Sequence, residues 1–468
     1  MARIAVLGGG VCGLSAALML ARDGHEVSVF ERDGAPVPDS PEAACERWER
    51  DGVTQFRQAH FMQPGGRAVL EEELPDVLEA LERGGAEQID LLSFMPPMIE
   101  DRSPRAGDER FVTVTARRPV IECALAQAAA EEPRLDVRRG AGVRQLTLER
   151  RDGAAHVTGI ELESGETHLA DLVVDAMGRA SPLPRWLHDA GVGEVHEEGG
   201  DSGFIYYTRY FRSLDGSTPQ VIAPLLTALG TISLLTIPAD SQTWSVTTFV
   251  SSGDKPLKAM REETVWTAVV KACPLHAHWL AGEPVTDVIA MGGIMDRRRS
   301  LLVDGRPLAT GVVLLADAWA CTNPSLGRGM TLGLLHARGL RDVAREHLDE
   351  PARLAQAWDA FTEERLAPWY LATLEEDRSR LREIEALRAG REPEPPSGPS
   401  ALRQATIAVM LGDADLFRSF LDDRSVHVPL GETLSRDGLG ESVLERAAEV
   451  ERLALPGPSR EDLLALVA

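Results

Sequence analysis

Wholly apolar and glycine-rich segments follow one another at the start of the chain. Residues 4–7 are apolar without interruption, as in a short buried strand, and glycines stand at positions 8, 9, 10 and 13. Residues 14–21 place apolar side chains on one helical face. Gly24 can take the left-handed conformation that ends a helix, and a second strand over residues 26–30 leads to Glu31. The pattern predicts a β-α-β unit.

Each glycine of the Gly-x-Gly-x-x-Gly turn has a separate task. Gly8 permits a tight turn, Gly10 lets a pyrophosphate approach the backbone, and Gly13 lets the helix lie close to the sheet. The helix start offers N–H donors and a positive dipole end to phosphates. We therefore expect a dinucleotide here rather than a turn without a ligand, although the turn alone does not separate FAD from NAD. The predicted contacts are Gly8, Gly10, Val11, Cys12, Gly13, Arg32 and Glu31, which is placed to bind a ribose.

A second strand and glycine loop occur far along the chain. The apolar residues 312–315 lead to Asp317, and a loop with Pro324, Gly327 and Gly329 then opens a helix. Glycines suit a place where a planar ring touches the backbone. A helix N-terminus suits the negative charge of a reduced flavin. A strand and glycine-rich turn without a ligand is the alternative.

Residues 311–333 resemble the second FAD fingerprint of the p-hydroxybenzoate hydroxylase superfamily, which comprises flavin monooxygenases, squalene-type epoxidases, flavin halogenases and geranylgeranyl reductases. The resemblance implies that Asp317 binds the ribityl chain of FAD. It also implies that the loop with Pro324, Gly327, Gly329 and Met330 brings backbone amides to the pyrimidine edge of the flavin. The usual Gly-Asp pair is Ala316-Asp317 here, which keeps the carboxylate.

Two stretches between the fingerprints extend the resemblance. Arg117-Arg118-Pro119 precedes a predicted helix, where the superfamily carries an arginine that faces the flavin or its phosphates. We favour Arg118 for this role, and a solvated neighbour at Arg117 is the plainer alternative. Residues 171–181 resemble the mid-chain strand and turn of the superfamily, which places Gly178 at the cofactor. Met177 replaces the aspartate with which NAD(P)H-using hydroxylases hold both cofactors, so the resemblance favours electrons from a separate reductase.

Residues 48–60 resemble a stretch of bacterial polyether and squalene-like epoxidases, with Thr54 in place of Pro. The resemblance puts His60 and Arg57 on the flavin side of the active site as candidate catalytic residues. The alternative is a surface arginine and a core histidine whose ring is satisfied by backbone carbonyls. Together with the turn after Met177, this stretch makes the epoxidase-like and halogenase-like branch the nearest part of the superfamily.

The resemblance covers residues 1–345 and implies an α/β fold, in which a Rossmann-like FAD-binding domain is interleaved with an antiparallel β-sheet substrate domain and followed by a C-terminal helical region. Residues 204–211, 231–236 and 243–250 are β-branched and aromatic and predict strands of that sheet. The predicted limits are 1–85, 117–190 and 290–345 for the FAD-binding domain, 86–116 and 191–289 for the substrate domain, 346–391 for C-terminal helices, 392–400 for a linker and 401–468 for a helical tail. The tail either caps the substrate entrance or mediates self-association.

Charge and cysteine content narrow the classes of partner. The 73 Asp and Glu against 49 Lys and Arg leave a formal net charge of −24, which repels nucleic-acid phosphates and anionic lipid headgroups. The five cysteines form no CxxC pair, so neither a disulfide framework nor a zinc site is expected. We find no signal-peptide pattern and no apolar run long enough to span a bilayer. We expect a cytoplasmic protein with no nucleic-acid partner, no membrane span and no metal.

The resemblance predicts an FAD-dependent monooxygenase. It implies that reduced flavin and oxygen form a C4a-hydroperoxide, which hydroxylates or epoxidises a small hydrophobic or aromatic substrate in a pocket closed to water. NAD(P)H is the electron source, either directly or through a separate flavin reductase, and the oligomeric state is left open. The alternatives are a flavin dehydrogenase or ene-reductase, a non-enzymatic FAD protein and, less favoured, a halogenase, because the Trp-x-Trp-x-Ile-Pro stretch of halogenases is absent.

Overall fold

The computed structural model describes residues 1–151, 154–436, 438–450 and 455–468. At its centre is a sheet in the order β21-β9-β1-β2-β5, in which all neighbouring strands are parallel. The strands are β1 Arg3–Leu7, β2 Glu26–Glu31, β5 Leu135–Arg139, β9 Leu172–Asp175 and β21 Val312–Leu314. The predicted β-α-β unit is β1, α1 (Val11–Arg22) and β2, and Gly24 takes the left-handed conformation with φ +96°.

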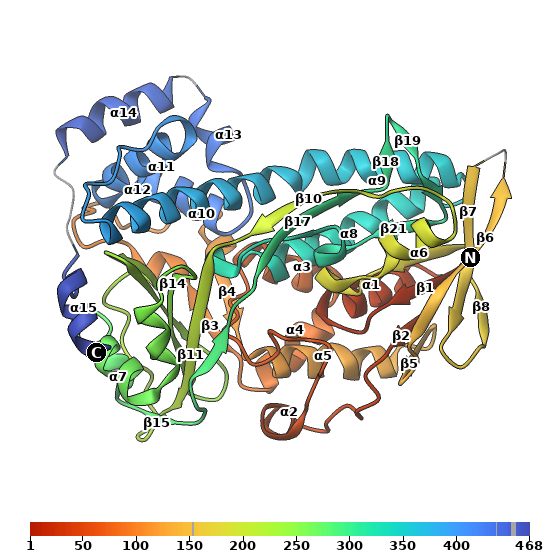
Figure 1. Cartoon of the computed structure of the whole chain (residues 1–468), viewed down its shortest axis with the longest axis horizontal. Helices are drawn as coiled ribbons and strands as arrows, with labels where there is room; N and C mark the ends of the chain where they lie inside the picture. Colours follow the sequence, from red (N-terminus) through yellow and green to blue (C-terminus); the bar gives the residue numbers. More distant parts are fainter. Residues whose placement is uncertain (152–153, 437, 451–454) are drawn as a thin grey trace.

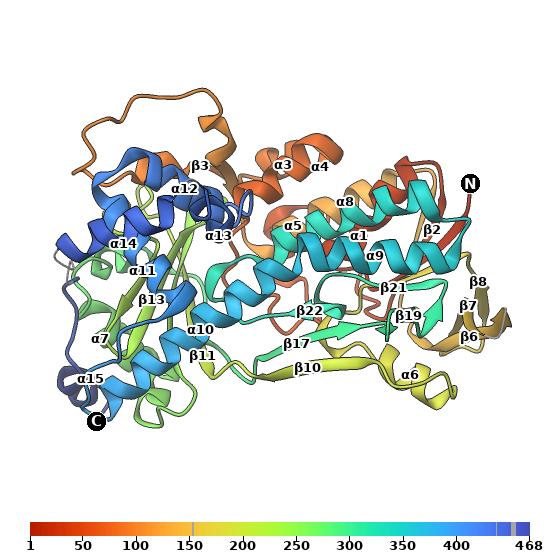
Figure 2. The same cartoon turned by 90° about the horizontal axis from the view of Figure 1, so that it is seen from above.

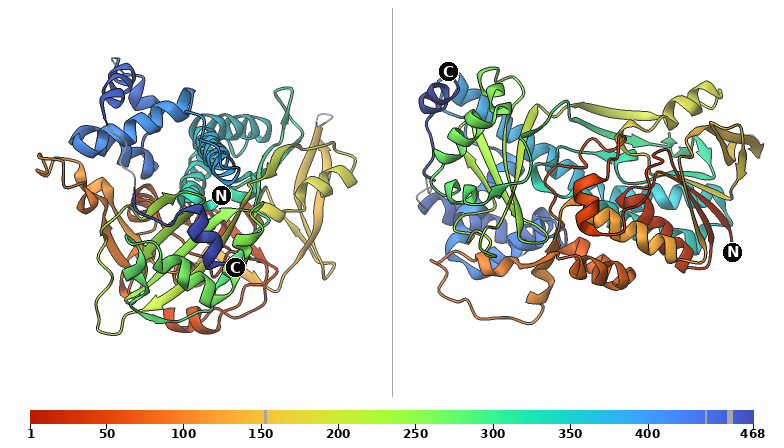
Figure 3. Two further views of the ribbon diagram at one scale, coloured as in Figure 1. Left: turned by 60° about the vertical axis from the view of Figure 1, so that its left-hand side comes forward. Right: turned by 90° about the horizontal axis from the view of Figure 1, so that it is seen from below.

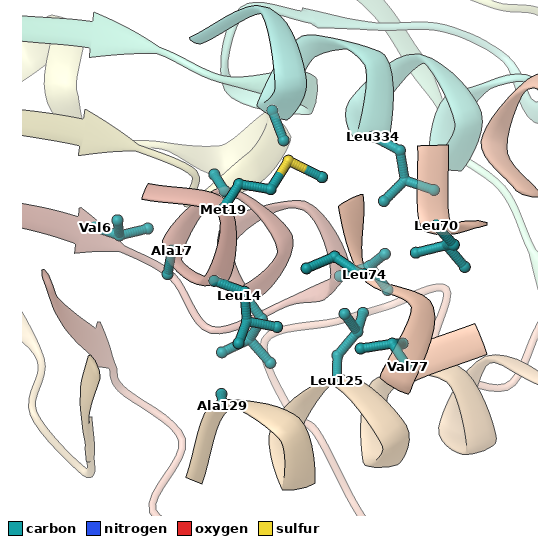
Figure 4. Packing of buried hydrophobic residues seen from close by; sticks show 14 of the residues in the cluster. Val6, Leu14, Ala17, Met19, Leu70, Leu74, Val77, Leu125, Ala129 and Leu334 are labelled. Carbon is teal, nitrogen blue, oxygen red and sulfur yellow. The ribbon is translucent and has the colours of Figure 1, made fainter. Parts of the chain in front are cut away.

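Helices cover one face of the parallel sheet. The inner helices are α1, α5 (Arg118–Glu131) and α8 (Gly329–His347), whereas α2 (Pro41–Arg47) and α4 (Pro75–Arg83) pack on α5 and α3 (Pro64–Glu73) packs on α8. Figure 4 shows Val6 of β1 near Leu14 of α1, with Leu125 of α5 and Leu334 of α8 in the same buried cluster. The apolar spacing seen in the sequence therefore becomes the core that holds the glycine turn against the sheet.

A smaller sheet covers the other face of the parallel sheet. Its strands are β6 Val143–Arg151, β7 Ala154–Leu162, β8 Thr167–Leu169 and β20 Ala309–Thr310. α6 (Leu183–Asp189) packs beside it, and Leu146, Val157 and Leu187 are buried there with Leu7 of β1. Both faces of the parallel sheet are thus buried, which explains why β1, β9 and β21 are nearly all apolar.

The other half of the molecule is an antiparallel sheet in the order β12-β13-β14-β11-β15, with β16 also paired to β11. Its strands are β11 Phe204–Arg212, β12 Leu226–Leu229, β13 Ile232–Pro238, β14 Thr243–Ser251, β15 Glu283–Pro284 and β16 Ile289–Met291. The strands predicted over residues 204–211, 231–236 and 243–250 are β11, β13 and β14. α7 (Glu263–Lys271) covers its outer face (Figure 1). A ribbon of β10 (His196–Asp201) and β17 (Met295–Ser300) runs between the two halves (Figure 2).

The C-terminal region is helical. The described residues of the region predicted as C-terminal helices and helical tail form α9 Pro351–Arg365, α10 Ala367–Arg388, α11 Gly398–Val409, α12 Ala414–Arg424, α13 Leu430–Leu434, α14 Leu439–Glu449 and α15 Arg460–Leu466. Figure 3 shows α11–α14 gathered at the substrate-sheet end, beside the segment between β3 (Glu87–Asp90) and β4 (Val112–Thr115). None of the described helices is both long and apolar enough to cross a bilayer. The predicted α/β class with an antiparallel sheet and a helical C-terminal region is confirmed.

Candidate cofactor and substrate site

A cavity of about 790 Å³ lies where the parallel strands end and the antiparallel sheet begins. Its walls include every residue that the sequence predicted for cofactor binding. These are Gly8, Gly10, Val11, Cys12, Gly13, Glu31, Arg32, Arg118, Gly178, Asp317, Pro324, Gly327, Gly329 and Met330. The fold therefore brings two signatures that are far apart in the sequence to one cavity.

The glycine turn has the shape that its three tasks require. Gly8 has φ +104°, and a Cβ there would lie 2.6 Å from the carbonyl oxygen of Ala176. A Cβ on Gly13 would lie 2.1 Å from the carbonyl oxygen of Gly8, so this glycine allows α1 to approach the turn. A Cβ on Gly10 would meet open space within 4 Å, on the cavity side. α1 begins there without a side-chain cap, so its first N–H groups are free for a phosphate.

Glu31 at the end of β2 is held by neighbouring groups. Its Oε2 accepts hydrogen bonds from the Gly9 N–H at 2.9 Å and from Arg50 at 2.6 Å, and its Oε1 accepts one from the Asp33 N–H at 2.9 Å. A carboxylate has about four acceptor sites, so Glu31 retains capacity for a ribose hydroxyl. The Arg50 side chain is 1% exposed and also pairs with Asp33 and Glu122. Sequence reasoning missed Arg50, because its partners are far away in the chain.

A chain of buried charges continues from Arg50 towards His60. Glu122, which is fully buried, accepts hydrogen bonds from Arg50 at 2.5 Å and from Arg118 at 2.7 Å. Arg118 lies 3.3 Å from Nε2 of His60. A guanidinium can only donate, so Nε2 accepts and Nδ1 donates to the Gln58 carbonyl at 2.9 Å. Burial and, secondarily, Arg118 lower the pKa of His60 to about 3, so this ring on the cavity wall is neutral.

The side chains of Arg57 and Arg117 lie elsewhere than the sequence predicted. Arg57 was predicted to line the site with His60, but its guanidinium donates to the backbone carbonyls of Cys45 and Trp48, and it is absent from the described residues that line the cavity. Arg57 does not line the cavity because the backbone carbonyls at the end of α2 supply acceptors for its N–H groups. Arg117 is not a solvated neighbour: it donates through its backbone N–H and its side chain to the buried Asp240.

Asp317 of the second signature lies near the positive charges of Arg118 and Arg179. Burial raises the pKa of Asp317, while the charges of Arg118 and Arg179 act to lower it. Ala316, where the superfamily has glycine, has φ +52°, and its N–H donates to Nδ1 of His336 at 3.0 Å. The Arg299 side chain, 2% exposed, donates hydrogen bonds to the backbone carbonyls of Arg179 at 3.2 Å and of Ala318 at 3.0 Å. The buried Arg299 thus ties the turn at Gly178 to the turn at Asp317, a role that the sequence did not reveal.

The loop Pro324–Gly329, which we call the cofactor loop, leads into α8. Gly327 is left-handed with φ +62°, and a Cβ on Gly329 would meet open space within 4 Å. Gln63 holds the loop by donating from Nε2 to the Leu326 carbonyl at 3.0 Å. α8 starts at Gly329 without a side-chain cap. Two uncapped helix starts and two glycines with open space around them fit a dinucleotide whose two ends contact backbone, as FAD requires.

The antiparallel sheet provides the remaining wall. Leu235 of β13, Thr247 of β14 and Thr208 of β11 are neighbours in register and all face the cavity. The Thr208 hydroxyl donates to Oε1 of Gln58 at 2.8 Å and lies 2.9 Å from the Thr247 hydroxyl. Tyr206 also lines this wall, and its hydroxyl donates to Asn323 behind the wall at 2.8 Å. This wall presents hydroxyl, amide and apolar groups.

Comparisons with known proteins agree with this architecture. Residues 6–40 match the family of NAD(P)-binding Rossmann-like domains. Protein Rv3254 of Mycobacterium tuberculosis is 27% identical over an alignment of 365 positions that covers 72% of this chain and 71% of that protein.

Solved structures of flavin enzymes are similar over most of the chain. PqsL, a probable FAD-dependent monooxygenase from Pseudomonas aeruginosa, matches with a TM-score of 0.59 and 16% identity over 82% of this chain and 96% of its own. The anhydrotetracycline hydroxylase OxyS from Streptomyces rimosus matches with a TM-score of 0.56 and 17% identity over 91% of this chain and 75% of its own. The chain therefore has the fold of FAD-dependent monooxygenases and hydroxylases of known structure.

Proposed function

We propose that the protein is an FAD-dependent monooxygenase that inserts one oxygen atom, by hydroxylation or epoxidation, into a small uncharged organic substrate. The observation that carries the proposal is the one cavity in which both nucleotide signatures meet the inner face of the antiparallel sheet. The fold shared with FAD-dependent monooxygenases and hydroxylases supports the same activity.

The residues of this chain bind, orient and shield the reactants. FAD, when bound, supplies the electron transfer and the activation of oxygen. The N-terminus of α1 would hold the diphosphate, and Asp317 would accept hydrogen bonds from the ribityl hydroxyls. The cofactor loop and the N-terminus of α8 would stabilise negative charge on the flavin. His60, neutral with a pKa of about 3 and with both ring nitrogens bonded to Gln58 and Arg118, shapes the cavity wall and donates no proton at neutral pH.

The substrate wall determines the class of substrate. Of the described residues that line it, none carries a charge at neutral pH: Gln58, Ala59, His60, Phe61, Tyr206, Thr208, Leu235, Thr247, Met291 and Ile294. A carboxylate or ammonium buried against this wall would lose its hydration, and Arg118, which lines the cavity beside His60, is already paired with Glu122. We therefore assign a neutral substrate with an apolar body and hydroxyl or carbonyl groups that reach Gln58 and the two threonines.

Isotope transfer tests the activity. The FAD-loaded protein, reduced with dithionite and freed of excess reductant, is mixed with ¹⁸O₂ and either 2-naphthol and related neutral phenols or the matching carboxylates. We expect the products of the neutral compounds to contain one ¹⁸O atom. The amount of labelled product should be at least tenfold higher than from the carboxylates. Oxidised products without ¹⁸O would replace the proposal with a dehydrogenase, and a protein that does not bind FAD would remove it.

The electron source is part of the proposal. Met177 lines the cavity at the point where NAD(P)H-using relatives carry an aspartate, and a thioether is a weak acceptor for a nicotinamide cofactor. We infer that a partner reductase or reduced FAD supplies the electrons. Stopped-flow measurement of flavin bleaching at millimolar NADPH tests this inference. Slow bleaching that a general flavin reductase accelerates is the expected result, and fast bleaching without a reductase would establish direct use of NADPH.

A further inference from the structure

The cofactor loop is held from behind by the C-terminal helices. Arg328 stands between Gly327 and Gly329, which both face the cavity, but its own side chain is 2% exposed and is directed to the opposite side. There its guanidinium donates to Oδ2 of Asp423 on α12 at 2.7 Å. It also lies over the ring of Trp369 on α10, with 5.2 Å from Cζ to the ring centroid. The Arg328 side chain is thus buried between α10 and α12.

Asp423 belongs to an ionic cluster of Arg328, Glu376, Arg403, Asp423 and Arg424, in which Arg328 and Asp423 are buried and the other three are partly buried. Both terminal nitrogens of Arg403 lie 3.1 Å from Oδ2 of Asp423, and Oδ1 accepts from the Leu430 N–H at 3.1 Å. Glu376 of α10 pairs with Arg403 at 3.0 Å and with Arg424 at 3.5 Å. Removal of one member of such a cluster leaves its partner charged and buried. The cluster therefore selects one position of α12 relative to the loop.

A second contact joins the same part of α12 to the cavity wall. The Gly65 N–H at the start of α3 donates to the Ser425 carbonyl at 2.9 Å. Val426 follows with φ +63°, a conformation that a β-branched residue adopts only when its surroundings hold it there. Phe61, which lines the cavity, is buried in one apolar cluster with residues of α11 and α12, including Val409 and Phe417. The tail thus supports the cofactor loop and the substrate wall together.

We propose that Asp423 is a positioning residue for the cofactor and acts through Arg328, whose backbone it holds in the conformation that contacts FAD. The inference rests on the proposed FAD site. By linkage, bound FAD must stabilise the docked position of α12 by the same free energy that docking adds to FAD binding. Of the two roles predicted for the tail, this one is closer to a cap, but it supports the cofactor rather than the substrate entrance.

Asp422 provides a matched control on the same helix. It pairs with Arg110 of the main body through two hydrogen bonds of 2.8 and 3.1 Å, and its side chain contacts neither the cofactor loop nor the Asp423 cluster in any interaction found among the described residues. Asp422→Asn therefore removes one attachment of α12 and leaves Arg328 in place. Asp423→Asn removes the charge that Arg328 contacts while preserving side-chain shape.

The test is a titration of full-length apoprotein with FAD, followed by flavin fluorescence. We expect Asp423→Asn to raise the Kd for FAD at least tenfold, and Asp422→Asn to change it less than twofold. Arg328→Gln leaves Asp423 paired with Arg403 and should show the same loss, and the double variant should be no weaker than Arg328→Gln. Arg328→Gln carries the test where Asp423→Asn does not fold by circular dichroism.

A second measurement separates positioning from general stability. FAD should slow amide hydrogen exchange in α12 of the wild type and of Asp422→Asn, and should do so much less in Asp423→Asn. Wild-type affinity in Asp423→Asn and Arg328→Gln would overturn the inference, and so would an equal loss in Asp422→Asn. Failure of the wild type to bind FAD is seen before any variant is compared and defeats the proposed function itself.

Discussion

The two walls of the cavity are built from different groups. On the cofactor side, backbone N–H groups of uncapped helix starts face the cavity, and buried charges run from Glu31 through Arg50, Glu122 and Arg118 to His60. On the substrate side, the described lining residues are neutral and come from strands paired in register. The first wall suits a charged ligand of fixed shape, and the second suits an uncharged one.

This difference predicts how each wall tolerates change. A backbone surface has no side chain that can rearrange, so an added Cβ at the wrong glycine excludes the ligand. Buried charges depend on their partners, so single charge removals act strongly and depend on pH. Four substitutions on the cofactor side, three of them with a control substitution, test this view in order of decreasing expected effect.

Gly10→Val should abolish retention of FAD while leaving the fold intact. Gly10 has φ −86° and ψ −175°, which valine adopts readily, and its Cβ would meet open space in the protein alone. That space is the one assigned to the pyrophosphate. Gel filtration followed by the ratio of absorbance at 450 and 280 nm measures retention, and circular dichroism measures the fold.

Gly13→Val provides the contrast to Gly10→Val. Its Cβ would lie 2.1 Å from the Gly8 carbonyl oxygen, so the backbone itself must move and the protein should lose stability with or without FAD. Full occupancy of FAD in Gly10→Val would show that the turn is not the diphosphate site.

Asp317→Ala should weaken FAD binding by about 1.5–3 kcal/mol, the range for a lost charge-assisted hydrogen bond. Within the described part of the chain we find no hydrogen-bond donor to this carboxylate, so its removal leaves no protein group unpaired. Burial raises the pKa of Asp317, which means that the apoprotein should keep or gain stability. Titration of the apoprotein with FAD measures the effect, and an unchanged Kd would remove Asp317 from the ribityl role.

The cofactor wall could be predicted from sequence because its parts are local. Gly8, Gly10 and Gly13 belong to one strand-turn-helix unit, and Asp317 and Gly327 to another, so each motif carries its own geometry. The groups that join these units were missed because their contacts are distant in the chain: Arg50 meets Glu122 across 72 positions, and Arg328 meets Asp423 across 95.

Side-chain direction was the other limit on prediction from sequence. Arg57 and His60 lie three residues apart in one predicted motif, but the segment has no regular helix or strand to fix which side chain faces the cavity. The structure turns Arg57 to backbone carbonyls and leaves His60 at the cavity wall. The strands of the substrate sheet were predictable, whereas the inner face became identifiable only from the register that joins Thr208 to Thr247.

Asp377→Asn should make stability less dependent on pH. Asp377 of α10 accepts a hydrogen bond from Ser325 of the cofactor loop at 2.7 Å. Burial raises its pKa from 3.8 to about 7, and the hydrogen bond from Ser325 only partly opposes this. The folded state therefore binds a proton that the unfolded state releases, and the wild type loses stability as the pH rises from about 4 to about 7.

The Asp377→Asn variant lacks this loss of stability. Its free energy of unfolding should exceed that of the wild type by about 2–3 kcal/mol more at pH 8 than at pH 4.5, as urea denaturation would measure. Ser325→Ala removes a hydrogen bond that lowers the pKa of Asp377 but keeps the carboxylate, so it should keep or enlarge the pH dependence of the wild type. A variant that differs from the wild type equally at both pH values would show that Asp377 is ionised in the folded protein throughout this range.

Ala316→Gly should have the smallest effect and should act on stability alone. Ala316 has φ +52°, a conformation that costs an alanine about 1 kcal/mol and a glycine almost nothing. Its N–H donates to His336, whose ring stacks on Trp358 at a centroid distance of 4.3 Å, and this buried arrangement holds the alanine in place. Because the glycine also gains freedom in the unfolded chain, we expect the free energy of unfolding to rise by at most about 1 kcal/mol in thermal denaturation, with an unchanged Kd for FAD.

The buried Ala318, outside the left-handed region, is the control, and Ala318→Gly should lower stability. Equal destabilisation by both substitutions would mean that the left-handed turn before Asp317 carries no strain.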